Sequence, residues 1–151
     1  TTLQMRAAPA ANASAMMPGA SSRAGSTDLI AQAADFRRQR KFKEAAEVYR
    51  RAAGAGRMTA DSWADYADAL ASAGSSLKGA PTDALARALA LDPRHPKALW
   101  LKASLEHEEH RYRDAVSTWR NLLAVVPANS SDALIIEANI AEATRLAASQ
   151  G

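Results

Sequence analysis

Three histidines, two of them beside glutamates, are the residues of this chain best suited to metal or haem chemistry. His107 and His110 are three positions apart, so they would share one helix face, with Glu106 and Glu109 adjacent. A protein metal site needs three or four converging ligands, and the sequence gives no sign of another ligand that converges on this pair. His95 stands apart from the pair. We therefore expect no metal, haem or other cofactor on this chain.

Nucleophilic catalysis has equally little support in the sequence. The chain has no cysteine, which excludes disulfides, thiol catalysis and cysteine metal sites within it. No serine lies in the glycine-flanked, strained turn that a serine hydrolase places between a strand and a helix. We predict that the chain is not an enzyme.

Basic residues are concentrated in the first third of the chain. Most residues of the run 37–43 are arginine or lysine, and Arg50, Arg51 and Arg57 follow. Guanidinium groups can hold a peptide carboxylate or another acidic group in bidentate geometry, but such a run can also be a solvated face. Aromatic residues that could stack on bases are not interleaved with it, so we predict no nucleic-acid binding. The net charge of +3 is mild and leaves an acidic partner open.

The elements that carry these residues recur along the sequence. Phe42, Ala45, Tyr49 and Ala52 reappear at one constant offset, two repeats further on, as Tyr112, Ala115, Trp119 and Leu122. Trp63 follows Leu29, and Pro127 follows Pro93, at about half that offset. A period of about 34 residues with small, aromatic and proline positions is typical of tetratricopeptide (TPR) repeats. We predict an all-α fold, a TPR solenoid of three helix-hairpin repeats in a right-handed superhelix, closed by a C-terminal capping helix.

Composition and turn residues divide the chain into a tail and one repeat domain. Residues 1–25 are rich in alanine, serine and glycine without a sustained period, and we expect a flexible linker. We expect residues 26–151 to form the TPR domain, with repeats at about 26–59, 60–95 and 96–129 and a capping helix at about 130–148.

Several residues mark the expected helix ends. Ser26 is predicted to cap the first helix, and Asn129 to begin the last one. Gly54 and Gly56 should end the second helix, because glycine accepts the left-handed conformation found beyond helices. Pro81 should lie in the first turn of a helix, where its missing amide does no harm.

The first helix of each repeat is expected to line a concave groove, the usual ligand surface of solenoids. The candidate groove residues are Ile30, Ala34, Arg37, Arg38, Ala64, Asp68, Ala71, Lys97, Trp100, Ser104 and His107. Leu99 should fill the space between the helices, so the neighbouring Trp100 should point elsewhere. Its indole could anchor a peptide side chain or pack against the capping helix, and the sequence leaves both open.

The later part of the chain resembles one branch of the repeat family. Similarity extends over Thr59 to Ala147 and depends on Trp63, the ALALDP motif at 88–93, Leu99, Trp100, Trp119 and the terminal helix. These features resemble the TPR domain of bacterial cytochrome c biogenesis proteins, the haem-lyase accessory family of the NrfG, CcmH C-terminal and CcmI type. The resemblance implies a periplasmic domain that captures apocytochrome c in its groove, while haem-lyase subunits carry the haem and thiol chemistry.

Other expectations concern membranes and partners. No run of about 18 apolar residues is present, so we predict no membrane span. Because the chain begins Thr1-Thr2-Leu3, we expect a processed or truncated piece that lacks the membrane anchor some members of the family carry. A homo-oligomer stays open. The alternative function is a generic TPR scaffold subunit of another bacterial envelope or secretion complex.

Overall fold

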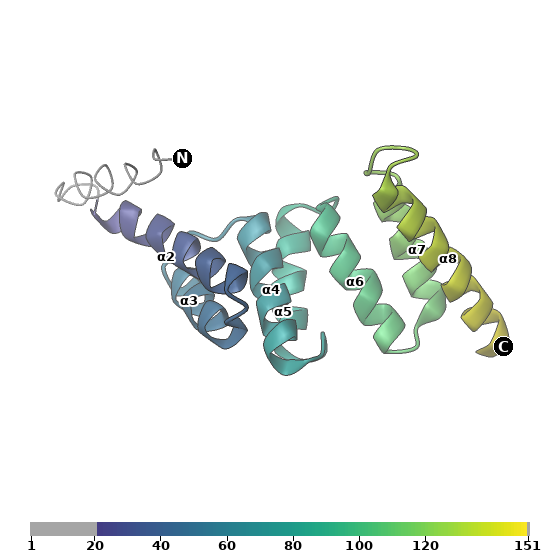
Figure 1. Ribbon diagram of the computed structural model, residues 1–151, viewed down its shortest axis with the longest axis horizontal. Helices are drawn as coiled ribbons and strands as arrows, with labels where there is room; N and C mark the ends of the chain where they lie inside the picture. Colours follow the sequence, from purple (N-terminus) through teal and green to yellow (C-terminus); the bar gives the residue numbers. More distant parts are fainter. Residues whose placement is uncertain (1–20, 151) are drawn as a thin grey trace.

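Helices make up nearly all of the structure, a computed structural model that describes residues 21–150. This part of the chain contains seven helices and no strand, which confirms the all-α prediction for it. The helices are α2 (Ser21–Arg38), α3 (Phe42–Gly54), α4 (Ala60–Gly74), α5 (Ala80–Leu91), α6 (Pro96–Glu108), α7 (Tyr112–Leu123) and α8 (Ser131–Gln150) (Figure 1).

Consecutive helices pack against each other in chain order. Helices α2 and α3, α4 and α5, and α6 and α7 form three hairpins side by side, and α8 packs against α7 (Figure 1). Helix α4 also contacts α6, which links the second and third hairpins through their first helices. The result is an elongated, repeat-like row with α2 and α8 at opposite ends.

The turns inside the first and third hairpins have matching hydrogen bonds at equivalent positions of the repeat. The Lys41 amide donates to the Phe36 carbonyl at 2.8 Å, and the Arg111 amide donates to the Glu106 carbonyl at 2.8 Å. The residue before each donor has a φ of 62°, in the left-handed region. The sequence repeat is therefore a repeat of backbone conformation at these two turns.

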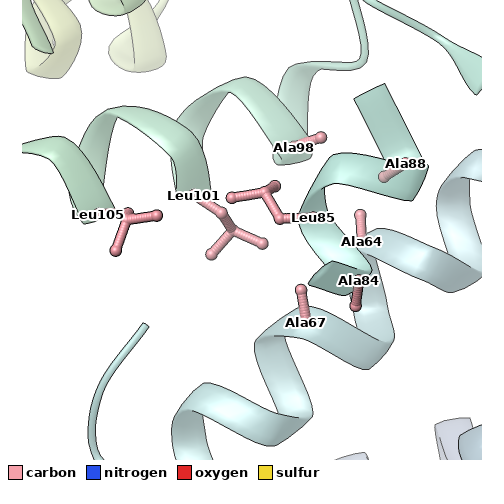
Figure 2. Close-up of a cluster of buried hydrophobic side chains, with 8 residues drawn as sticks. All are labelled: Ala64, Ala67, Ala84, Leu85, Ala88, Ala98, Leu101 and Leu105. Atoms are coloured by element: carbon pink, nitrogen blue, oxygen red, sulfur yellow. The ribbon is translucent and has the colours of Figure 1, made fainter. Parts of the chain in front are cut away.

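Small side chains let the helices approach closely in the interior. Figure 2 shows the middle core cluster, in which the small side chains of Ala64, Ala67, Ala84, Ala88 and Ala98 are grouped with the larger Leu85, Leu101 and Leu105. A first core cluster lies in the α2–α3 hairpin and a last one between α6, α7 and α8. Alanine has no side-chain entropy to lose in a helix, so one residue type supports both the helices and their packing.

Helix ends follow the sequence in part. Pro81 lies in the first turn of α5, and Gly56 has a φ of 74° just after α3, as predicted. Helix α2 begins at Ser21, so residues 21–25 are helical and Ser26 lies inside the helix; the prediction that Ser26 caps it is wrong. The rest of the expected linker, residues 1–20, lies outside the described residues. Asn129 does not begin α8, because the Ser130 hydroxyl accepts the hydrogen bond from the Ala133 amide.

Hydrogen bonds to the third hairpin hold the loop inside the second hairpin in place. The Glu108 carboxylate of α6 accepts hydrogen bonds from the Ser76 hydroxyl and from the Leu77 amide, the latter at 3.1 Å. These two bonds lower the pKa of Glu108. The loop between α4 and α5 therefore ties the second and third hairpins together.

A carboxylate is buried inside the third hairpin. Glu106 is 2 % exposed, and it accepts hydrogen bonds from the Lys102 ammonium at 2.6 Å and from the Thr118 hydroxyl at 2.6 Å. A buried charge is tolerated only when it is paired and hydrogen-bonded, and both conditions hold here. This network belongs to the hairpin interior and explains why a glutamate occupies an inward position of α6.

Candidate functional site

The predicted groove residues lie on α2, α4 and α6, and the structure divides them into three groups. Ala64 is fully buried in the middle core cluster, so its assignment to an open groove is wrong. Ile30 packs against the first core cluster, while Ala34 and Ala71 are half-buried. The remaining candidates form two groups. One contains charged residues near the middle of the row of helices, and the other contains residues of α6 near the end of the row formed by α8.

Four charged side chains form an ion network across three helices. Lys97 of α6 lies 2.8 Å from Asp65 and 3.0 Å from Asp68, both of α4. Arg37 of α2 lies 3.4 Å from Asp65 and 3.9 Å from Asp68. Two positive and two negative groups compensate each other, so Arg37 and Lys97 already have acidic partners within the chain. Arg38 is also paired, with Asp35 at 2.9 Å.

This network changes the expected role of the basic residues. The sequence suggested that Arg37, Arg38 and Lys97 could meet acidic groups of a ligand, but each carries an intramolecular ion pair. A ligand carboxylate would have to displace a partner at every one of them. We infer that Arg37 and Lys97 position α2, α4 and α6 relative to one another, whereas Arg38 pairs only within α2.

Tyr49 lies next to this network. Burial raises the pKa of the Tyr49 hydroxyl, and the nearby Asp65 carboxylate raises it further. The hydroxyl forms no hydrogen bond of standard geometry with any described residue, although Arg37 is close enough to lower its pKa in part. The Tyr49 ring stacks in tilted geometry on Tyr66, with the centroids 5.9 Å apart.

The α6 candidates line a cavity at the other end of the row. Its volume is about 320 Å³, and its walls are Trp100, Ser104 and His107 of α6, Trp119 of α7, and Asn139 and Glu142 of α8. Helix α6 presents its three residues together because they are spaced by four and three positions. Helix α8 closes the opposite side, so the capping helix forms part of the site.

Trp100 both packs in the core and lines the cavity, and its role as a peptide anchor stays a prediction. It is half-buried and packs against the last core cluster, which includes Ile136 and Ala143 of α8. Its ring also lines the cavity and meets Trp119 edge to face, with the centroids 4.8 Å apart and the planes at 82°. Packing on one side fixes the indole, and the other side stays available for contact.

Trp119 brings an unused hydrogen-bond donor to this region. The residue is 4 % exposed, and its Nε1 atom has no hydrogen-bond partner among the described residues. Buried polar groups are usually paired, so an unpaired donor in a cavity-lining residue is unusual. The atom itself is buried, so this N–H is not exposed to the cavity in the structure.

Polar side chains surround the aromatic pair. The Ser104 hydroxyl donates to the Trp100 carbonyl at 2.9 Å, His107 packs edge-on against Tyr112 at 5.1 Å, and Glu142 lies 3.6 Å from Arg145. Asn139 offers both a donor and an acceptor. The cavity thus combines an aromatic wall with polar groups that can bind a peptide backbone.

The histidines do not converge on a metal. His107 and His110 both pack edge-on against the Tyr112 ring. His95 lies 2.5 Å from Asp61 and accepts a hydrogen bond from the Ala98 amide at the start of α6. Within residues 21–150, no three histidine, aspartate or glutamate side chains are grouped as a metal site requires.

Four residues of these sites were missed by the sequence reasoning. Asp65 is not among the predicted groove residues, because the predicted groove face of α4 contains Ala64 and Asp68. Trp119 was assigned only to the core, and Asn139 and Glu142 belong to a helix that was treated only as a cap. The three-residue spacing of Asp65 and Asp68 was the one signal that could have revealed the ion network.

No helix in the described part of the chain is long and apolar enough to cross a membrane. No protein-family model matches the sequence, and no curated protein matches it. Among solved structures, the chain is similar to the crystal structure of a protein provisionally named YfrE from Vibrio parahaemolyticus. The two sequences are 28% identical, the TM-score is 0.50, and the match covers 60% of this chain and 99% of that chain.

Proposed function

We propose that this chain is a non-catalytic adaptor that binds a segment of another protein in a groove ending at the Trp100 cavity. In this proposal the hairpins are TPR repeats in a right-handed solenoid, with α8 as the capping helix. The observation that carries it is the cavity between α6, α7 and α8, with its edge-to-face Trp100–Trp119 pair and the polar residues beside it.

The chemistry of the cavity suits a peptide. An apolar side chain can fill the space beside the two indoles, and aromatic anchors in pockets dominate binding energies at interfaces. Backbone carbonyls and amides of the segment can pair with Asn139 and Glu142. The volume of about 320 Å³ lies at the lower end of ligand-site volumes, which suits one or two side chains of a longer segment.

The proposed pathway is c-type cytochrome maturation. Support comes from the resemblance of residues 59–147 to the cytochrome c biogenesis family described above. On this proposal the domain works in the periplasm, binds unfolded apocytochrome c and presents it to haem-lyase subunits. Haem attachment itself would belong to those partners.

Calorimetric titration with C-terminal peptides of the same organism's c-type apocytochromes tests this function. Wild-type protein should release or absorb heat that a scrambled peptide does not. Trp100→Ala should weaken binding by about 1–3 kcal/mol, because it removes the anchor of the cavity. The matched control is Leu134→Ala, which removes an apolar side chain that is 60% exposed and lies outside the cavity.

The outcomes separate three readings of the site. No heat with any apocytochrome peptide would reject the proposed substrate. Unchanged affinity of Trp100→Ala, together with a lower melting temperature, would leave Trp100 as a packing residue only. Loss of binding in both variants would indicate general damage to α8 and its surroundings, which a circular dichroism spectrum of each variant would show.

A scaffold role in another envelope or secretion complex is the second candidate. Leu134 and Ile135 on α8 are 60% and 49% exposed, although both are large and apolar. Such neighbours on a terminal helix could continue the stack of helices into a partner subunit. Pull-down with wild-type protein and Leu134→Ala from a membrane extract distinguishes the two: haem-lyase components retained by both favour the adaptor, and assembly factors lost from the variant favour the scaffold.

A further inference from the structure

Two arginines on the outer face of α7 have no acidic partner within the described part of the chain. Arg113 and Arg120 are exposed, and neither belongs to any ion pair formed by residues 21–150. They are seven positions apart in the sequence, so they lie on one face of the helix. The rise of about 1.5 Å per residue separates them by about 10 Å along the helix axis. Ser117 lies between them on the same face.

The equivalent face of the first hairpin contains an acidic residue that pairs with one of its two cations. Lys43, Glu47 and Arg50 occupy the repeat positions that Arg113, Ser117 and Arg120 occupy in the third hairpin. There the Glu47 carboxylate lies 2.5 Å from Arg50, and that hydrogen bond lowers the pKa of Glu47. In the third hairpin a serine replaces the glutamate, so the repeat keeps its cations and loses the anion that would compensate them.

A cavity adjoins these uncompensated arginines. It has a volume of about 370 Å³ and lies between α7 and α8. Its walls include Arg113, Val116, Ser117 and Arg120 of α7, and Thr144 and Ala147 of α8. Val116 and Ala147 are buried and make an apolar floor, and Ser117 and Thr144 add hydroxyl-bearing side chains to the walls. It shares no residue with the walls of the Trp100 cavity.

We propose that this face is a second docking surface, which binds an acidic segment of a partner protein. The surface supplies two guanidinium groups, each able to hold a carboxylate through two parallel hydrogen bonds. A segment in the polyproline II conformation has three residues per turn and advances about 3.1 Å per residue, so carboxylates three positions apart point to the same side and lie about 9 Å apart, close to the spacing of the two arginines. The surface therefore selects a segment with two acidic residues separated by two small residues. This inference does not depend on the peptide groove.

Fluorescence anisotropy with a labelled ten-residue peptide tests the proposal. The peptide carries two aspartates with two alanines between them, and its control carries asparagines instead. Wild-type protein should bind the aspartate peptide at low salt, bind the asparagine peptide at least about tenfold more weakly, and lose affinity as salt rises. Arg120→Gln should weaken binding about tenfold for the same reason.

Two further variants make the test specific to this face. Ser117→Glu rebuilds the compensation seen in the first hairpin, and it should weaken binding about as much as Arg120→Gln without touching the core. Arg50→Gln changes the net charge by the same amount at the equivalent position of the first hairpin, and it should change the affinity by less than about twofold. Trp100→Ala should bind as wild type does.

Three results would overturn the proposal. The first is no binding of the aspartate peptide to the wild-type protein. The second is an equal loss in Arg50→Gln and Arg120→Gln, which would indicate attraction by overall charge. The third is binding of inorganic phosphate at this face without binding of the peptide, which would indicate a small-anion site. Circular dichroism confirms that each variant is folded, so a loss of binding cannot come from unfolding.

Discussion

The first and third hairpins place different side chains at four equivalent positions of the repeat. Ile30, Ala34, Arg37 and Tyr49 in the first correspond to Trp100, Ser104, His107 and Trp119 in the third. In the first hairpin, the arginine of this set is paired with two aspartates of the next hairpin. In the third, the whole set lines a cavity of about 320 Å³. The repeat thus supplies a common backbone, and the side chains decide which part of the row can bind a ligand.

The interiors of the two hairpins differ in the same way. Phe36 packs against the first core cluster, which includes Val48. The equivalent residues in the third hairpin are Glu106 and Thr118, which form a buried hydrogen-bonded pair with Lys102 nearby. Either solution holds two helices together, but only the polar one depends on keeping every partner in place.

The largest expected effect is on that polar pair. Glu106→Ala should lower the free energy of unfolding by about 2–4 kcal/mol, because it opens a cavity and leaves the buried Thr118 hydroxyl without its acceptor. Urea denaturation measures it. The double variant Glu106→Phe with Thr118→Val recreates the pair of the first hairpin and should recover most of the loss. A single-variant cost below about 0.5 kcal/mol would mean that the two interiors are not the alternatives described here.

The next effect concerns the ion network that joins the hairpins. Asp65→Asn should cost about 1 kcal/mol at low salt and less at high salt, because the four charges are partly exposed and therefore screened. Denaturation at two salt concentrations measures this difference. Asp35→Asn is the control, because its partner Arg38 lies on the surface of the same helix, and the cost should stay within about 0.5 kcal/mol. Equal costs for both variants would argue against a network that positions helices.

A pH effect is expected at the loop held by Glu108. The pKa of Glu108 is lowered in the folded protein, so its stabilising contribution is present above the ordinary carboxyl value of 4.5 and is lost as pH falls through the lowered folded value. Hydrogen exchange of the Leu77 amide should therefore lose protection at acid pH. Glu108→Gln should show lower protection at neutral pH and little further loss on acidification. The residue at the equivalent position of the first hairpin, Arg38, has no such loop to hold.

The smallest expected effect concerns the hydroxyl of Tyr49. Tyr49→Phe removes a buried hydroxyl that has no hydrogen-bond partner among the described residues, so stability should stay equal or rise by up to about 1 kcal/mol. The raised pKa of Tyr49 means that the folded state holds this proton more tightly, so stability should fall as pH rises above about 10. The variant should show a shallower fall. A loss of more than about 1 kcal/mol at neutral pH would instead reveal a hydrogen bond of this hydroxyl.

The sequence predicted the helical class well, and the reason is local. Alanine-rich stretches with apolar residues at helical spacing, and turn residues such as Gly56 and Pro81, specify helices without knowledge of their neighbours. The repeat also placed Trp100, Ser104 and His107 on one face of α6, because that face depends only on spacing within one helix.

Properties that depend on neighbouring helices were harder to predict. Ala64 and Asp65 are adjacent in sequence, yet one is fully buried and the other belongs to an ion network with α2 and α6. Which of them faces the groove depends on how α4 is rotated between its neighbours. Likewise, the sequence predicted the last helix as a cap. Its polar residues Asn139 and Glu142 line a cavity only because of where the helix packs.

Nuclear magnetic resonance of the three tryptophan indoles tests the central claim most directly. Trp100 and Trp119 line the proposed peptide site, while Trp63 lies at a separate cavity between α3, α4 and α5 and serves as an internal control. Addition of a binding apocytochrome peptide should shift the indole N–H signals of Trp100 and Trp119, because both rings line the cavity, and leave Trp63 in place. A shift of Trp63 alone, or binding measured by calorimetry without any change at Trp100 and Trp119, would contradict the account.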